Sequence, residues 1–205
     1  MKLVILGATG KTGQILVQQA VQRGHIVTAV VRNPDKLTAT PGVKIVQGNV
    51  TRAGELSKVF KDQDAVLSTL GNNNAKLQLI ERSSSAIIKA MQVTGLKRIV
   101  VELSFAGAES AQLSKVLSVM SNLGIGKMLV DQTKGVELFR RSKLDWTIAY
   151  AVILTNKPLT KEIRVLDSHE KIGMSHKISR ADVAHFMLDS VEKGTHIKGL
   201  PVISN

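Results

Sequence analysis

Three glycines at three-residue spacing, Gly7, Gly10 and Gly13, stand between an apolar run and a stretch with helical periodicity. A glycine-rich turn that opens a helix exposes backbone N–H groups where the helix dipole favours negative charge. Gly10 lets the backbone approach a phosphate, while Gly7 and Gly13 allow a sharp turn and close packing of helix on sheet. The spacing therefore predicts a pyrophosphate-binding loop, one residue off the usual G-x-G-x-x-G dinucleotide fingerprint.

Polar side chains between these glycines add donors for the same ligand. Two threonine hydroxyls can donate to phosphate oxygens, and one lysine adds positive charge. The alternative, a glycine-rich corner without a ligand, is weakened by the apolar run before it and by the strand–helix alternation after it. The residues assigned to cofactor binding in this loop are Gly7, Thr9, Gly10, Lys11, Thr12 and Gly13.

The residue after the next apolar run indicates which dinucleotide the loop holds. That run covers residues 26–31 and ends about twenty positions past the glycine loop, where the adenosine ribose is recognised. An acidic residue there would favour NAD, but Arg32 can bind a 2′-phosphate through paired hydrogen bonds. With Lys36 as a further charge, the sequence predicts NADP. The alternative for Arg32 is an ordinary surface arginine before a turn.

Apolar and helical segments alternate along the chain and must position these residues. Strands are expected at residues 1–6, 26–31, 43–47, 64–70, 97–103, 145–149 and 200–203. Helices are expected at residues 14–22, 53–60, 76–94, 112–119 and 127–141, and between a Ser179 cap and Gly194. The pattern predicts an α/β fold of the Rossmann type, with a doubly wound parallel sheet in one domain over residues 1–205. A small C-terminal region, residues 156–174, is expected to cover the substrate and to carry a short strand at residues 163–165.

The carboxyl ends of parallel strands meet at one edge of such a sheet, and ligands bind there. Asn49 and Val50 follow the third strand and are expected near the adenine. Leu70 and Gly71 close the fourth strand, where a glycine lets the cofactor pass close to the backbone. All four are therefore assigned to cofactor binding.

The charge balance indicates an anionic ligand. Lysine and arginine number 28 against 16 aspartates and glutamates, a net charge of +12. The basic residues are scattered, and four Phe, one Trp and one Tyr provide no platform for stacking bases, so nucleic acid is disfavoured. A phosphate-rich cofactor and an anionic small-molecule substrate explain the sign, although a solvated basic surface accounts for most of the lysines.

The cysteine content and the search for targeting segments indicate the cellular compartment in which the protein works. The sequence has no cysteine, which excludes disulfides and zinc–thiolate sites and suits a reducing cytosol. No signal peptide and no membrane-spanning run are visible. No spacing of His, Asp and Glu indicates a metal site. We therefore expect a cytoplasmic protein that acts on a small molecule, without metal or membrane.

Several segments together resemble the atypical short-chain dehydrogenase/reductases with an NAD(P)H-binding, NmrA-like domain; they are residues 7–13, 27–32, 48–50, 64–66, 70–71, 142–147 and 178–184. Residues 157–160 and 185–188 are most similar to the flavin reductase/biliverdin-IX-beta reductase group. The resemblance implies NADPH as cofactor and a flavin (FMN, FAD or riboflavin) as hydride acceptor. It also implies that Ser104, at the end of the fifth strand, is a catalytic residue beside the nicotinamide. The alternative for Ser104 is a strand-end serine that satisfies a backbone group.

Two departures from the family pattern bear on the chemistry. The Tyr-x-x-x-Lys pair is absent: the single tyrosine, Tyr150, lies at the end of a predicted strand, and Leu154 takes the lysine position. Ketone and alcohol chemistry therefore lacks its proton donor. Ile153 takes the place of the histidine in the group's Pro-Pro-His run, which disfavours tetrapyrrole reduction more than flavin reduction.

Hydride transfer to a conjugated acceptor survives these departures, because a flavin ring delocalises the charge and the protein supplies mainly proximity and orientation. A redox-sensing regulator of the NmrA type, which would bind NADP without turnover, is the alternative. A nucleotide-sugar epimerase or dehydratase is disfavoured by the chain length and the absent tyrosine motif.

Overall fold

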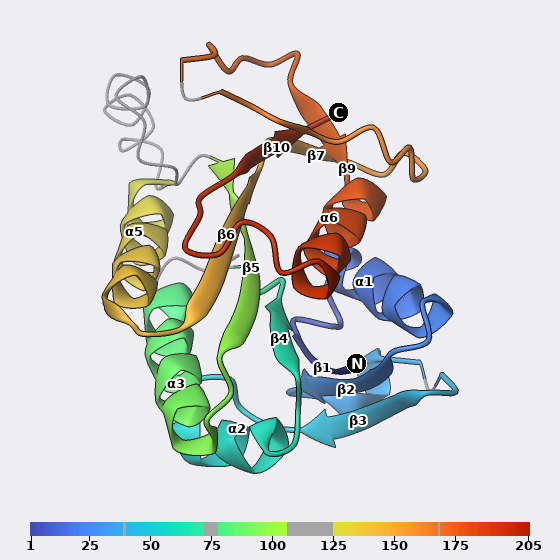
Figure 1. Ribbon diagram of the computed structural model, residues 1–205, viewed down its shortest axis with the longest axis vertical. Coiled ribbons are helices and arrows are strands. Elements are labelled where there is room, and N and C mark those ends of the chain that lie inside the picture. The colour runs from blue at the N-terminus through green and yellow to red at the C-terminus, as the bar shows by residue number, and fades with distance from the viewer. Residues whose placement is uncertain (39, 72–77, 106–124, 168) are drawn as a thin grey trace.

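The computed structural model describes residues 1–38, 40–71, 78–105, 125–167 and 169–205. Its central sheet has eight strands in the order β3-β2-β1-β4-β5-β6-β10-β8, and all neighbours are parallel except β10 and β8 (Figure 1). The strands are β1 (Lys2–Leu6), β2 (Ile26–Val31), β3 (Val43–Gln47), β4 (Ala65–Ser68), β5 (Arg98–Ser104), β6 (Asp145–Ala151), β8 (Arg164–Val165) and β10 (Val202–Ser204). The mostly parallel sheet with helices on both faces confirms the predicted Rossmann-type fold class.

Helices cover both faces of this sheet (Figure 1). On one face lie α1 (Lys11–Gln22) and α6 (Arg180–Glu192), packed against each other. On the other face lie α2 (Ala53–Phe60), α3 (Leu79–Thr94) and α5 (Ile125–Arg141). A single 3₁₀ turn, η1 (Pro34–Lys36), follows β2. The helix expected at residues 112–119 lies outside the described residues.

Two apolar layers hold the sheet and its helices together. In β1, Leu3 and Ile5 pack on the α1/α6 side, whereas Val4 and Leu6 pack on the α2/α3/α5 side. All four have no exposed surface. A strand buried on both faces must be apolar at every position, which is why β1 reads as a continuous apolar run.

Most element boundaries agree with the sequence. Gly95, with φ +75°, ends α3, and the Ser179 hydroxyl accepts a hydrogen bond from the Asp182 N–H at 2.9 Å, as predicted for the cap of the last helix. However, α1 begins at Lys11, three residues before the predicted start, because its first turn is part of the glycine loop. β6 also runs two residues further, to Ala151.

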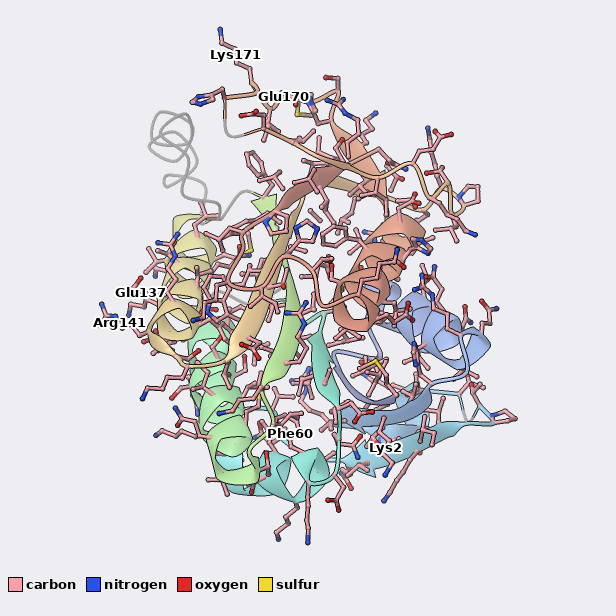
Figure 2. The ribbon with its side chains drawn as sticks, viewed as in Figure 1. Lys2, Phe60, Glu137, Arg141, Glu170 and Lys171 are labelled. Atoms are coloured by element: carbon pink, nitrogen blue, oxygen red, sulfur yellow. The ribbon has the colours of Figure 1, made fainter. Side chains whose placement is uncertain are left out.

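A small second sheet was not predicted. Strand β7 (Ile153–Thr155) pairs in parallel with β9 (Lys177–Ser179), and each has three residues, too few to give a periodic pattern. The segment between them carries β8, within the stretch where a short strand was expected. Figure 2 shows Glu170 and Lys171 of this segment at the end of the molecule opposite Phe60 of α2. The segment therefore lies toward the carboxyl ends of β5 and β6 (Figure 1).

Candidate active site

Strand register places the ends of β1 and β4 level with positions in β5 and β6 that lie three residues before the ends of those strands. Leu6 of β1 pairs with Ser68 of β4. Ser68 pairs with Val101 of β5, and Val101 pairs with Ile148 of β6. The residues that follow these positions therefore come together at the carboxyl edge of the sheet. This is the edge at which open α/β sheets bind their ligands.

The glycine loop is held by contacts that only glycine allows. Gly7 has φ +84°, and a Cβ atom there would lie 2.7 Å from the Thr69 carbonyl oxygen. A Cβ atom on Gly13 would lie 2.1 Å from the Gly7 carbonyl oxygen. Gly10 is different: a Cβ atom there would come within 3.2 Å of the Gly7 oxygen and would meet no other described atom within 4 Å. Gly7 and Gly13 thus shape the loop, and Gly10 keeps its outer surface clear.

The start of α1 is suited to an anion. Gly10 is the N-cap, no side chain caps the helix, and its first turn has no acidic residue. The first backbone N–H groups of the helix are therefore left for an external acceptor. Thr9 and Lys11 are exposed beside this turn, whereas Thr12 is only 7% exposed. The loop thus fits a pyrophosphate, with Thr9 and Lys11 as its accessible side chains.

Thr69, which the sequence reading missed, fixes the loop to the adjacent strand. Its backbone N–H donates to the Leu6 carbonyl oxygen at 2.9 Å. Its hydroxyl lies 3.3 Å from the Leu6 oxygen and 3.4 Å from the Gly7 oxygen. A polar residue at a strand end was the only signal in the sequence, and it did not indicate which strand Thr69 would join.

Arg32 is exposed immediately after β2. Because Val30 pairs with Leu6, Arg32 leaves the sheet at the level of the glycine loop. Its carbonyl oxygen accepts a hydrogen bond from Gln47 Nε2 at 3.3 Å. The adjacent turn η1 is capped by the Asn33 side chain and carries Lys36, which is also exposed. Arg32 and Lys36 are therefore both exposed in the segment that follows β2, at the edge where a 2′-phosphate is predicted.

Asn49 organises the turn after β3. Its Oδ1 atom accepts hydrogen bonds from the Thr51 N–H at 3.0 Å and the Thr51 hydroxyl at 2.8 Å. Its own N–H donates to Glu55 Oε2 at 2.7 Å, and this bond lowers the pKa of Glu55. Val50 is buried in the core. The adenine contact predicted for Asn49 and Val50 thus falls on a turn stabilised by its own hydrogen bonds.

The residues at the ends of β4 and β5 leave this edge open. Leu70 is half-buried against the α2/α3/α5 core, and Gly71 is exposed with no described atom within 4 Å of a Cβ position. Ser104 is the exposed last residue of β5 and pairs with Ala151. The sites predicted for the nicotinamide half of the cofactor therefore lie on neighbouring strands.

Glu102, a second residue that sequence reasoning missed, lies two positions before Ser104 on the same face of β5. It is half-buried, and its desolvation raises the pKa of the carboxyl group to about 7, although Arg180 acts in the opposite direction. A group with this pKa can give or take a proton near neutral pH. An acidic residue inside an otherwise apolar strand was the available signal.

Tyr150 lies level with Leu103 of β5, but on the face of the sheet opposite to Glu102 and Ser104. It is 2% exposed and packs in the core beneath α3 and α5. Its side chain therefore faces the layer opposite to the one that receives the glycine loop, and it is not placed to act as the usual proton donor. Ile153 begins β7 and is 40% exposed. The sequence lacks the Tyr-x-x-x-Lys pair, and the one tyrosine that it contains does not take over the position of the missing proton donor.

The carboxylate of Asp182 holds the segment that follows β7. Its oxygens accept hydrogen bonds from the Thr160 N–H at 3.0 Å, the Lys161 N–H at 2.8 Å and the Ser179 hydroxyl at 2.6 Å. Asn205 Nδ2 donates to the same carboxylate at 2.7 Å. Asp182 has no exposed surface. One buried side chain thus fixes the start of the predicted covering region to α6 and to the C-terminal residue.

Across the described residues, no helix has the length and apolar character required to cross a membrane. In the same part of the chain, no group of three or more His, Asp or Glu side chains is placed to hold a metal ion.

The sheet order, the glycine loop and the uncapped start of α1 define a Rossmann-type dinucleotide-binding protein. A family model described as NAD(P)H-binding matches residues 7–193. The chain belongs to this NAD(P)H-binding family.

Known proteins show the same relationship over the full chain. The uncharacterized protein YwnB of Bacillus subtilis is 32% identical over 205 residues, which cover 96% of this chain and 94% of YwnB. The oxidoreductase ylbE of Lactococcus lactis has a similar structure, with a TM-score of 0.86 and 19% identity over 100% of this chain and 91% of that chain. SP1627 of Streptococcus pneumoniae, a candidate NADH-flavin reductase, has a TM-score of 0.81 and 24% identity over 100% of this chain and 99% of that chain.

Proposed function

We propose that this protein reduces a flavin with NADPH. The observation that carries the proposal is the burial of Tyr150, because it leaves the site without the tyrosine that protonates an alkoxide in ordinary ketone and alcohol chemistry. An acceptor that spreads the incoming negative charge over its own ring avoids this requirement, and a flavin does so. The structural likeness to SP1627 agrees with this choice of acceptor.

The geometry of the edge supports an assignment of the residues that would hold NADPH. The N–H groups at the start of α1 would bind the pyrophosphate, with Thr9 and Lys11 beside them. Arg32 and Lys36 would bind the 2′-phosphate and so select NADPH over NADH. When bound, the nicotinamide supplies the hydride. Ser104 would orient the ring or the acceptor through its hydroxyl group.

A turnover assay tests the proposal. The purified protein is mixed with NADPH and, in separate reactions, FMN, FAD or riboflavin, and the absorbance of reduced nicotinamide is followed. We expect absorbance to fall at a rate proportional to protein concentration, and faster than with NADH. No protein-dependent loss with any of the three flavins would refute the proposed activity.

The same buried tyrosine favours one other function, a redox-sensing regulator that binds NADP without consuming it. This alternative predicts tight NADP binding and no turnover. Isothermal titration calorimetry with NADP⁺, alongside the assay above, separates the two functions. Binding with turnover supports the reductase, and binding without turnover supports the regulator.

A further inference from the structure

Glu102 is the acidic residue that the strand register brings to the cofactor edge. Val101 aligns with Ser68, and Ser68 aligns with Leu6, so Glu102 is the first residue of β5 beyond the level at which β1 ends. Gly7, the first residue of the glycine loop, follows Leu6 directly. Glu102 and the loop therefore stand at the same level of the sheet, with β4 between them.

The side chain of Glu102 lies on the layer that also receives the glycine loop. Side chains alternate along a strand, and Val100 packs on the α1/α6 side. Glu102 therefore points to that side, as does Ser104 one step nearer the edge. Its neighbour in β6 is Ala149, which is small. The carboxyl group thus shares a face with the start of α1 and with Ser104.

Among the described residues, the charged group that acts on Glu102 comes from one packed element, α6. Arg180, the first residue of α6, is the charged side chain that acts on it, and it lowers the pKa less than desolvation raises it. Arg180 donates its own hydrogen bond to Asn156 Oδ1 at 2.7 Å. Asp182, on the same turn, accepts its bonds from Thr160 and its other partners described above. Among the described residues, no side chain or backbone group makes a hydrogen bond or salt bridge to Glu102.

An ionised carboxyl group in this position is costly to the fold. Burial with no hydrogen-bond partner among the described residues favours the protonated acid, so Glu102 holds its proton up to about pH 7, where an exposed carboxyl group is already ionised. A structural ion pair would look different, with an arginine or lysine in contact and the pKa lowered. The observed surroundings match a group that is kept neutral and able to donate.

We propose that Glu102 is the proton donor to the flavin in the reduction inferred above, and this role rests on that proposed function. Reduction of the acceptor takes up one hydride and one proton, and NADPH, the source of the hydride, is oxidised to NADP⁺. The O–H bond of the Glu102 carboxyl group breaks, and its proton forms the new bond to a ring nitrogen of the flavin. The carboxylate then recovers a proton from water, so no other reactant is consumed.

The test compares wild-type protein with Glu102→Gln, which keeps the size of the side chain but cannot titrate. Glu137→Gln is the matched control, because Glu137 is a partly exposed carboxylate on the outer side of α5, paired with Arg141 (Figure 2). The first measurement needs no cofactor: the carboxyl groups of ¹³C-glutamate-labelled protein are titrated by NMR from pH 4 to pH 9. We expect one carboxyl resonance that titrates near pH 7 in wild-type and control protein and that is missing from Glu102→Gln. A Glu102 resonance that titrates below pH 5 would overturn the proposal.

The second measurement is the pH dependence of a single turnover with NADPH and FMN. Wild-type and Glu137→Gln rates should fall as pH rises through 7, because the acid loses its proton. The Glu102→Gln rate should be about tenfold lower at pH 6 and nearly independent of pH. Turnover with an unchanged profile in Glu102→Gln refutes this role alone. Absence of turnover in all three proteins refutes the flavin reductase function and this role with it.

Discussion

Asp131 of α5 caps a helix to which it does not belong: its Oδ2 atom accepts a hydrogen bond from the Ile80 N–H at 3.0 Å, and its Oδ1 atom accepts one from the Glu81 N–H at 2.9 Å. The N-cap residue of α3, Gln78, has φ +43° and provides no side-chain cap of its own. The buried carboxylate therefore supplies the acceptors that the first turn of α3 lacks. A carboxylate at the N-terminus of a helix also interacts favourably with the helix dipole.

Replacing this cap should destabilise the protein. Asp131→Ala leaves two N–H groups without their acceptor, and we expect a loss of about 2–3 kcal/mol in the free energy of unfolding. Urea denaturation followed by circular dichroism measures it. Glu137→Ala, on the same helix but in a partly exposed ion pair with Arg141, should cost less than about 0.5 kcal/mol. Equal losses in the two variants would contradict the capping role.

Alanine substitutions of the loop glycines should distinguish effects on stability from effects on NADPH binding. Gly10→Ala brings its Cβ within 3.2 Å of a single carbonyl oxygen, so we expect stability to change by less than about 1 kcal/mol. Its methyl group would nevertheless occupy the surface proposed for the pyrophosphate and reduce NADPH affinity at least about tenfold. Thermal denaturation and calorimetric titration together measure both effects. Full NADPH affinity in Gly10→Ala would place the pyrophosphate elsewhere.

Gly13→Ala should behave differently, because its Cβ would overlap the Gly7 carbonyl at 2.1 Å and cannot be accommodated without moving the loop. We expect a loss of more than about 3 kcal/mol in stability as well as loss of NADPH binding. The same two measurements apply. A Gly13→Ala protein as stable as Gly10→Ala would show that the loop yields more easily than its contacts indicate.

The sequence predicted the sheet well because its central strands are buried on both faces. Strands such as β1 and β2 need apolar side chains at nearly every position, and this continuous signal does not depend on the rest of the fold. The glycine loop was also predictable, since three evenly spaced glycines between an apolar run and a helical stretch are typical of a phosphate-binding turn. Its geometry assigns separate tasks that the spacing could not distinguish, with Gly7 and Gly13 for packing and Gly10 for access.

Contacts between distant segments could not be predicted. Asp131 reaches Ile80 across 51 positions, and its residue type alone suggests a solvated helix face. Glu102 likewise gains its raised pKa from the burial that β5 and its neighbours create, which no local pattern encodes. The strands β7 and β9 are stabilised by each other and are too short to show a pattern of their own.

Cofactor choice can be tested at the end of β2. Arg32→Asp replaces the proposed 2′-phosphate ligand with a repulsive charge, so the Kd for NADPH should rise about 100-fold or more, while that for NADH should change less than about threefold. Lys89→Asp, an exposed site on α3 with the same change in net charge, controls for the overall field. Fluorescence titration measures all six constants, one for each dinucleotide with wild type and with each of the two variants. Equal weakening of both dinucleotides by Arg32→Asp would contradict the assignment.

Glu102 should also make stability depend on pH. Its folded pKa, about 7, is above the ordinary value of 4.5, so the folded protein binds this proton more tightly than the unfolded chain. The resulting stability is fully present below pH 4.5 and is lost as pH rises to 7. The shift corresponds to roughly 3 kcal/mol, which partial exposure reduces to about 1–2 kcal/mol.

Glu102→Gln removes this dependence. We therefore expect the variant to match wild-type stability near pH 5 and to exceed it by about 1–2 kcal/mol at pH 8, as measured by urea denaturation at both pH values. If Glu102→Gln were instead less stable than wild type at pH 8, the carboxylate would be held by Arg180 in a stabilising pair.

Asp182 links stability to the segment proposed to cover the substrate. Asp182→Asn converts one acceptor oxygen into a donor that faces the N–H groups of Thr160 and Lys161 or the Asn205 amide, so at least one of these bonds must be lost. We expect a loss of about 2–4 kcal/mol in stability and a raised KM for the flavin. The Kd for NADPH should stay unchanged, because the glycine loop is built from other elements. Asp62→Asn, at an exposed turn residue with φ +60°, is the matched control and should leave all three quantities unaltered. An unchanged KM in a destabilised Asp182→Asn protein would mean that this buried carboxylate supports the fold without shaping the acceptor site.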